Sequence, residues 1–181
     1  MNRANIISAN YHLRMLEAVL NYIRNNLEEF KNTPAITIYY RILMTLTVSE
    51  DITHYRQLIK LLDKNFHLFC HEEARQMYDF AQNYCIKKIN WGTISFGKEL
   101  FTLYKKLLEN KIIFKGKYLS QWDFKNIATI ALREEEFDWM KNFVQKYKEH
   151  VAPEFRKNAF AYNMAAYYFG IEKYREALKL M

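Results

Sequence analysis

The sequence predicts an all-α protein, a superhelix (solenoid) of about four antiparallel helix pairs, and three observations support this. Half of the 181 residues are hydrophobic and 17% are aromatic, which is enough to bury a substantial core. Only four Gly and two Pro are present, too few for the turns of a β-sandwich or barrel. Apolar residues recur at intervals of three and four, as they do on the buried face of an amphipathic helix.

Helix boundaries can be located from capping residues. Thr33 and Pro34 form an N-cap followed by proline at the first helical position, and Ser120–Asp123 has the S-x-x-D form of a capping box. Gly92, Gly116 and Gly170 fall where helices are expected to stop. The predicted helices span residues 5–30, 34–47, 50–66, 71–90, 94–110, 119–133, 135–150, 154–169 and 171–181.

Three of these helices carry a clear apolar stripe with a charged residue on the opposite face. The charged residues are Lys60, Lys105 and Lys141, one to each helix. Each stripe is wide enough to bury one side of its helix against a neighbour. The stripes are Tyr55, Leu58, Ile59, Leu62 and Phe66; Phe96, Leu100, Leu103, Leu107 and Leu108; and Phe137, Met140, Phe143, Val144 and Tyr147.

An aromatic residue near the start of the second helix of each pair recurs along the chain. These anchors are spaced 44, 41, 41 and 37 residues apart, and an apolar or small residue follows each one seven positions later. Such even spacing predicts repeated units within a single domain of residues 1–181, rather than one bundle. The anchors are Tyr11, Tyr55, Phe96, Phe137 and Tyr174, and the units span about 1–30, 34–66, 71–110, 119–150 and an incomplete 154–181.

The last unit resembles a tetratricopeptide repeat (TPR). Residues 163–170 (NMAAYYFG), followed by 174–178 (YREAL), match the small residue, aromatic, turn and Tyr-x-x-Ala-Leu of that motif. The resemblance implies close helix contacts at Ala165 and Ala177 and packing aromatics at Tyr168 and Tyr174. It extends over about 120–181, although Met140 stands where the repeat prefers Ala. With NYCIKKINWG followed by ELFTLYKKLL, the chain as a whole resembles divergent helical-repeat proteins of the Bacteroidetes.

No motif in the sequence supports catalysis, a cofactor or a metal. Residues 92–99 approach a phosphate-binding loop, but Glu99 replaces the hydroxyl residue and a predicted helix replaces the required strand. His67, Cys70 and His71 gather possible zinc ligands without a paired ligand signature. We therefore interpret both segments as ordinary helix connections and expect a protein that is not an enzyme.

The resemblance implies that the first helices of successive units line a concave groove that binds a protein or peptide partner. Asn163 occupies a position where the family often keeps Asn, and it either binds a peptide backbone or only satisfies its own helix. For the other positions the alternative is an ordinary core or surface role. Besides Asn163, the candidates are Trp122, Lys125, Thr129, Tyr162, Ala166 and Phe169.

The net charge of +7 leaves RNA as an alternative partner, although the lysines are scattered rather than repeated at equivalent positions. Two cysteines, no secretory h-region and no apolar run of membrane-spanning length predict a cytoplasmic protein without membrane contact. The last predicted helix ends at Met181 inside an apolar stripe. We therefore expect either a longer protein or a terminus that another chain covers, including a second copy.

Overall fold

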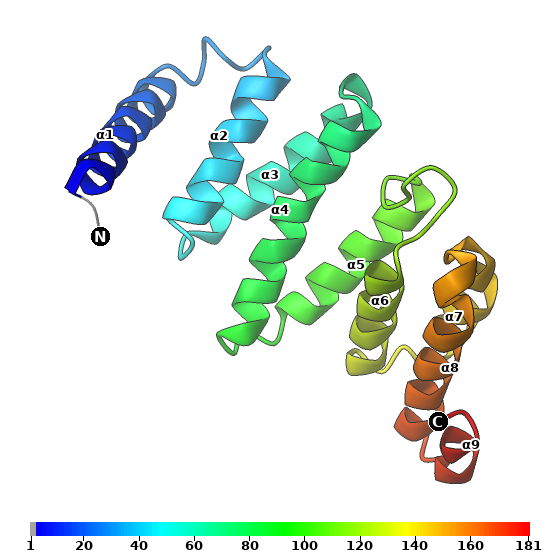
Figure 1. Ribbon diagram of the computed structural model, residues 1–181. Coiled ribbons are helices and arrows are strands. Elements are labelled where there is room, and N and C mark those ends of the chain that lie inside the picture. The colour runs from blue at the N-terminus through cyan, green and yellow to red at the C-terminus, as the bar shows by residue number, and fades with distance from the viewer. Residues whose placement is uncertain (1–2) are drawn as a thin grey trace. The chain divides into compact units, whose positions relative to one another are not determined.

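The computed structural model describes residues 3–181, with side chains from residue 14 onward. Within these residues the chain forms nine α-helices and two short 3-10 turns, and it forms no strand (Figure 1). The elements are α1 (Arg3–Asn25), α2 (Pro34–Thr47), α3 (Ile52–Asn65), η1 (Phe66–Leu68), α4 (His71–Asn90), α5 (Phe96–Glu109), α6 (Gln121–Arg133), α7 (Phe137–Tyr147), η2 (Lys148–His150), α8 (Pro153–Gly170) and α9 (Tyr174–Leu178).

The predicted all-helical class is confirmed, and most helix boundaries lie within three residues of the predicted ones. The first helix is the main exception, because α1 ends at Asn25 rather than at residue 30. There the side-chain amide of Asn26 donates to the carbonyl of Tyr22 at 2.8 Å. Such a local bond competes with the helical backbone pattern, which favours a turn. The last helix, α9, ends at Leu178 instead of residue 181.

The helix starts differ in how they are capped. At α6 the Ser120 hydroxyl accepts a bond from the Asp123 backbone N–H at 3.0 Å and donates to the Asp123 carboxylate at 2.8 Å, so the predicted cap forms. At α3 the Asp51 carboxylate accepts from the Thr53 N–H at 2.8 Å. At α2, Thr33 occupies the N-cap position and Pro34 begins the helix, as predicted. The prediction is wrong about the capping bond, because the Thr33 side chain makes none.

The contacts divide the chain into two compact units, Met1–Tyr84 and Cys85–Met181, with the boundary inside α4. In the first unit α2 packs against α3. The ring of Tyr55 stacks on that of Tyr84 at 4.8 Å between centroids, and the Tyr84 hydroxyl donates to the Ser49 carbonyl. A second apolar cluster joins α1 to α2 through Leu20, Tyr40 and Met44.

In the second unit α6 contacts three other helices, namely α5, α7 and α8, and α8 also contacts α7 and α9 (Figure 1). The loop that leads into α6 is tied to the end of η2, because the Leu119 N–H donates to the His150 carbonyl at 2.8 Å. This arrangement brings the first halves of α6 and α8 together. The residues buried completely in this core are Phe124, Ile127, Ala128, Ala131, Met140 and Val144.

Of the three glycines predicted to end helices, Gly92 and Gly170 lie at the ends of α4 and α8, whereas Gly116 lies beyond the end of α5, in the turn between Lys115 and Tyr118. Gly92 and Gly116 have φ of +89° and +60°, values that favour a residue without a Cβ. Gly170 is the last residue of α8, and a Cβ there would lie 3.2 Å from the ring of Phe137, so its role is close packing.

Ala165 and Ala177 are buried as the repeat resemblance implies, whereas Tyr174 is 52% exposed and does not bury its ring.

Candidate partner-binding site

Four of the residues predicted to bind a partner meet in one surface hollow between α6 and α8. Its volume is about 180 Å³. It lies between the first turns of α6, which starts at Gln121, and the middle of α8, which starts at Pro153. The hollow is lined by Gln121, Trp122, Lys125, Asn158, Ala159, Tyr162 and Asn163.

Two large aromatic side chains flank a lysine in this hollow. Trp122 is 65% exposed and Tyr162 is 56% exposed. Large aromatic side chains that are exposed next to each other often mark a surface that contacts a partner. The ammonium of Lys125 lies 5.3 Å from the centroid of the Tyr162 ring, within range of a cation–π contact across the two helices. The arrangement offers two ring faces and one positive charge to a partner.

Asn163 lies at the edge of the same hollow but is only 2% exposed. Its side-chain amide donates to the carbonyl of Ala159 one turn earlier, at 2.7 Å. Of the two roles predicted for Asn163, the geometry shows the bond to its own helix.

Three other predicted residues lie outside this hollow. Thr129 follows Trp122 by seven residues, and Phe169 follows Tyr162 by seven, so each lies about 10 Å further along its helix. Thr129 instead lines a separate hollow of about 220 Å³. Phe169 is 66% exposed, and its ring packs edge-to-face with Tyr174 at 5.4 Å. Ala166 is half-buried on α8 and does not line the hollow.

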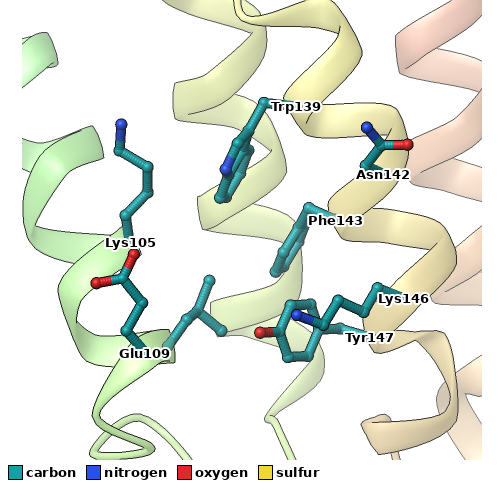
Figure 2. A pocket seen from close by; sticks show the side chains of 8 residues that line it. Lys105, Glu109, Trp139, Asn142, Phe143, Lys146 and Tyr147 are labelled. Atoms are coloured by element: carbon teal, nitrogen blue, oxygen red, sulfur yellow. The ribbon is translucent and has the colours of Figure 1, made fainter.

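A further hollow in this unit, of about 250 Å³, lies between α5 and α7 and was not predicted from the sequence. Figure 2 shows Trp139, Phe143 and Tyr147 following one another along α7, with Lys105 and Glu109 of α5 on the opposite wall. The Trp139 and Phe143 rings stack at 5.3 Å with 4° between their planes, and Phe143 and Tyr147 lie 5.3 Å apart. The three rings therefore pack against one another along α7.

The sequence did contain a signal for this hollow. Trp139, Phe143 and Tyr147 are spaced by four residues, which places all three on one face of a helix. The stripe predicted from Phe137 and Met140 included the last two but omitted Trp139, which lies beside that stripe. This hollow presents less exposed aromatic surface than the one between α6 and α8, because Phe143 is buried and Trp139 and Tyr147 are half-buried, whereas Trp122 and Tyr162 are exposed.

The two segments that resemble a phosphate-binding loop and a set of metal ligands lie in connections between helices and in the helix starts that follow them. Gly92 follows α4, a helix, and Lys98 lies in the first turn of α5, so the strand that a phosphate-binding loop needs is replaced by a helix. Cys70 is exposed and Cys85 is buried. In the part of the chain that is described, no three His, Cys, Asp or Glu side chains come together as a metal site. Over the same residues, no helix has both the length and the hydropathy needed to cross a membrane.

Comparison of this chain with protein-family models, with curated proteins and with solved structures finds no match. The interpretation of the hollows therefore depends on their own geometry and chemistry.

Proposed function

We propose that the chain is a non-catalytic helical-repeat scaffold, similar to tetratricopeptide repeats, that binds a protein or peptide segment between α6 and α8. One observation carries the proposal: Trp122 and Tyr162 are exposed on neighbouring helices on either side of Lys125, in a single hollow. Exposed Trp and Tyr at the centre of a contact surface are the residue types that contribute most to protein–protein binding energy.

The chemistry of the hollow suits a peptide. The two rings supply apolar contact area at small cost in side-chain entropy, because each has only two rotatable bonds. The amides of Gln121 and Asn158 also line the hollow, and each can donate to and accept from a peptide backbone. Lys125 favours a partner with a carboxylate near its apolar residue.

The repeat architecture is supported by how the helices of the second unit are related. Phe96, Phe137 and Tyr174, the last three anchors of the predicted period, are the first residues of α5, α7 and α9. Helix α6 contacts both its partner α7 and the next helix but one, α8. Stacked helix pairs make such contacts, because neither helix pair buries its apolar face alone.

The test is selection of peptides from a random displayed library, followed by measurement of their affinity for variants. We expect Trp122→Ala to weaken the selected peptides by at least about tenfold, since it removes a central aromatic contact. Trp91→Ala is the matched control, because Trp91 is also more than half exposed (55%, against 65% for Trp122) but lies outside the hollow. Equal affinity of both variants, or no selected peptide, would contradict the proposal.

A second candidate, binding of single-stranded nucleic acid, is favoured by the distribution of charge. Residues 85–181 contain 18 Lys and Arg against 11 Asp and Glu, so the whole net charge of +7 lies in this unit. Some of its lysines lie over exposed rings, for example Lys87 at 4.5 Å from the Trp91 centroid and Lys125 at 5.3 Å from that of Tyr162. Lysines beside aromatic rings are typical of surfaces that stack bases.

A salt titration with a labelled uridine oligonucleotide separates the two candidates. Nucleic-acid binding predicts an affinity that falls steeply and linearly on a log–log plot against salt, because counterions are released from the phosphates. Peptide binding through Trp122 predicts weak oligonucleotide binding and little competition with the selected peptide. Tight oligonucleotide binding that is lost in Trp122→Ala would favour the second candidate.

A further inference from the structure

The first unit contains a hollow that carries positive charge with no carboxylate in its lining. It has a volume of about 340 Å³ and lies where the turn after α1 meets α2 and α3. Lys31, Arg41 and Lys60 line it together with Leu27, Gln57 and Leu61, and most of the exposed surface is apolar. Since residues 1–84 as a whole carry as many acidic as basic residues, this concentration of cations is local.

Helical spacing explains why these residues come together. Gln57, Lys60 and Leu61 are three and four residues apart on α3, so they share one face of that helix. Arg41 belongs to α2, which packs against α3, and Lys31 lies in the turn that precedes α2. The charges therefore come from three segments of the chain.

Arg41 is held in place by neutral groups. Its guanidinium donates to the Nδ1 of His54 at 2.9 Å and lies 4.9 Å from the centroid of the Tyr40 ring. Partial burial lowers the pKa of Arg41 from its ordinary value, although not enough for the side chain to lose its charge. The guanidinium has further N–H donors that these two neighbours do not use.

The two lysines of the hollow are exposed. Lys60 lies on the exposed side of α3 and lines the hollow. Lys31 pairs with Glu28 at 3.2 Å, but both side chains are exposed, and such a pair contributes little to stability and exchanges easily. An incoming carboxylate can therefore bind between Lys31, Arg41 and Lys60 without breaking a buried interaction.

We propose that this hollow binds an acidic peptide segment in which carboxylates flank an apolar side chain. The three cations attract the carboxylates, and Leu27 and Leu61 offer the apolar surface against which a leucine-sized side chain packs. The hollow is shallow and open rather than enclosed, which suits one side chain of a longer chain better than a whole small molecule. This proposal concerns the first unit and does not depend on the groove between α6 and α8.

The test measures binding of a fluorescein-labelled peptide of repeated Glu-Glu-Leu by anisotropy. We expect Lys60→Glu to weaken binding by about tenfold, because it replaces an attractive charge in the hollow with a repulsive one. Lys64→Glu is the matched control, because it makes the same change in net charge at another exposed position of α3, outside the hollow. We expect it to change the affinity by less than about threefold.

Three outcomes would overturn this proposal. Equal loss in Lys60→Glu and Lys64→Glu would show attraction to net charge only. Equal binding of a Gln-Gln-Leu peptide would show that the carboxylates are not recognised. Tighter binding of a uridine oligonucleotide, with the same dependence on Lys60, would assign the hollow to nucleic acid. Trp122 and Lys125 belong to the second unit, outside this hollow. Trp122→Ala and Lys125→Glu should therefore leave binding of the Glu-Glu-Leu peptide unchanged, so failure of this proposal can be told from failure of the one for the hollow between α6 and α8.

Discussion

At the scale of single residues, His54 lies between a positive side chain, Arg41, and a negative one, Asp51. Its side chain is 12% exposed; its Nδ1 accepts from Arg41, and its Nε2 lies 3.6 Å from the Asp51 carboxylate. Burial lowers the pKa of His54 below its ordinary 6.5, and the positive charge of Arg41 lowers it further, while Asp51 acts in the opposite direction. The bond from Arg41 also requires the neutral ring, since a protonated Nδ1 cannot accept.

This environment predicts that acidification destabilises the fold through His54. The unfolded chain binds the proton near pH 6.5, whereas folded His54 binds it only at lower pH, so protons favour the unfolded state in between. The free energy of unfolding should therefore fall as the pH drops through 6.5, until the folded pKa is passed. Urea titrations at about pH 7.5 and about pH 5.5 measure this change.

The control for that prediction is His54→Gln, whose amide oxygen can still accept from Arg41 but does not titrate. The variant should lose less stability than the wild type between the two pH values. Asp51, whose pKa is lowered mainly by bonds from Thr53, stays ionised over this range and contributes no change. The same loss in both proteins would assign the effect to other groups.

At the scale of elements, the helix starts show which capping signals become bonds. Ser120 and Ser95 both occupy the N-cap position of a helix, α6 and α5 respectively. Only Ser120 has the extended backbone (ψ 147°) that lets its hydroxyl reach the N–H three residues on, whereas Ser95 is already helical (ψ −22°). The residue type is the same, and backbone conformation decides whether it caps.

We therefore expect Ser120→Ala to lower the free energy of unfolding by about 1 kcal/mol, because the Asp123 N–H in the first turn of α6 loses its side-chain partner. Ser95→Ala should change it by less than about 0.5 kcal/mol, since no side-chain bond is lost. Chemical denaturation of the two variants in parallel makes this comparison. Equal effects would mean that the Ser120 bond does not stabilise α6.

At the scale of the whole molecule, each unit has its own buried core, and the two differ in charge. Residues 1–84 are balanced in charge, and residues 85–181 carry the entire net charge. In the second unit Met140 is completely buried on α7. Its side chain fills space that Ala would leave empty.

Met140→Ala should accordingly lower the stability of this unit by about 2–5 kcal/mol through cavity formation. Tryptophan fluorescence during urea unfolding measures this unit specifically, because Trp91, Trp122 and Trp139 all belong to it. Lys141→Ala, a substitution at the next position on the same helix, should cost less than about 0.5 kcal/mol. A loss below about 1 kcal/mol for Met140→Ala would show that the core is not packed around α7.

Part of the candidate site was predictable, and part was not. Trp122, Lys125 and Tyr162 were identified because the repeat resemblance assigned them to helix faces, and the structure brings those faces together. Thr129 and Phe169 share helix faces with Trp122 and Tyr162 but lie outside the hollow. The sequence shows which residues share a face of a helix, but not at which point along that helix a neighbouring helix makes contact. The hollow lined by Lys31, Arg41 and Lys60 is formed by three separate segments of the chain, so no single stretch of sequence indicated it.

The sequence by itself determined the helices, because their apolar periodicity, capping residues and glycines act within a few positions of one another. It also determined the excess of basic over acidic residues. Only the tertiary structure decided which side chains share a surface, such as Lys125 with the Tyr162 ring and Arg41 with His54. Those contacts depend on how far one helix is shifted and rotated against another, and that offset comes from packing many side chains at once.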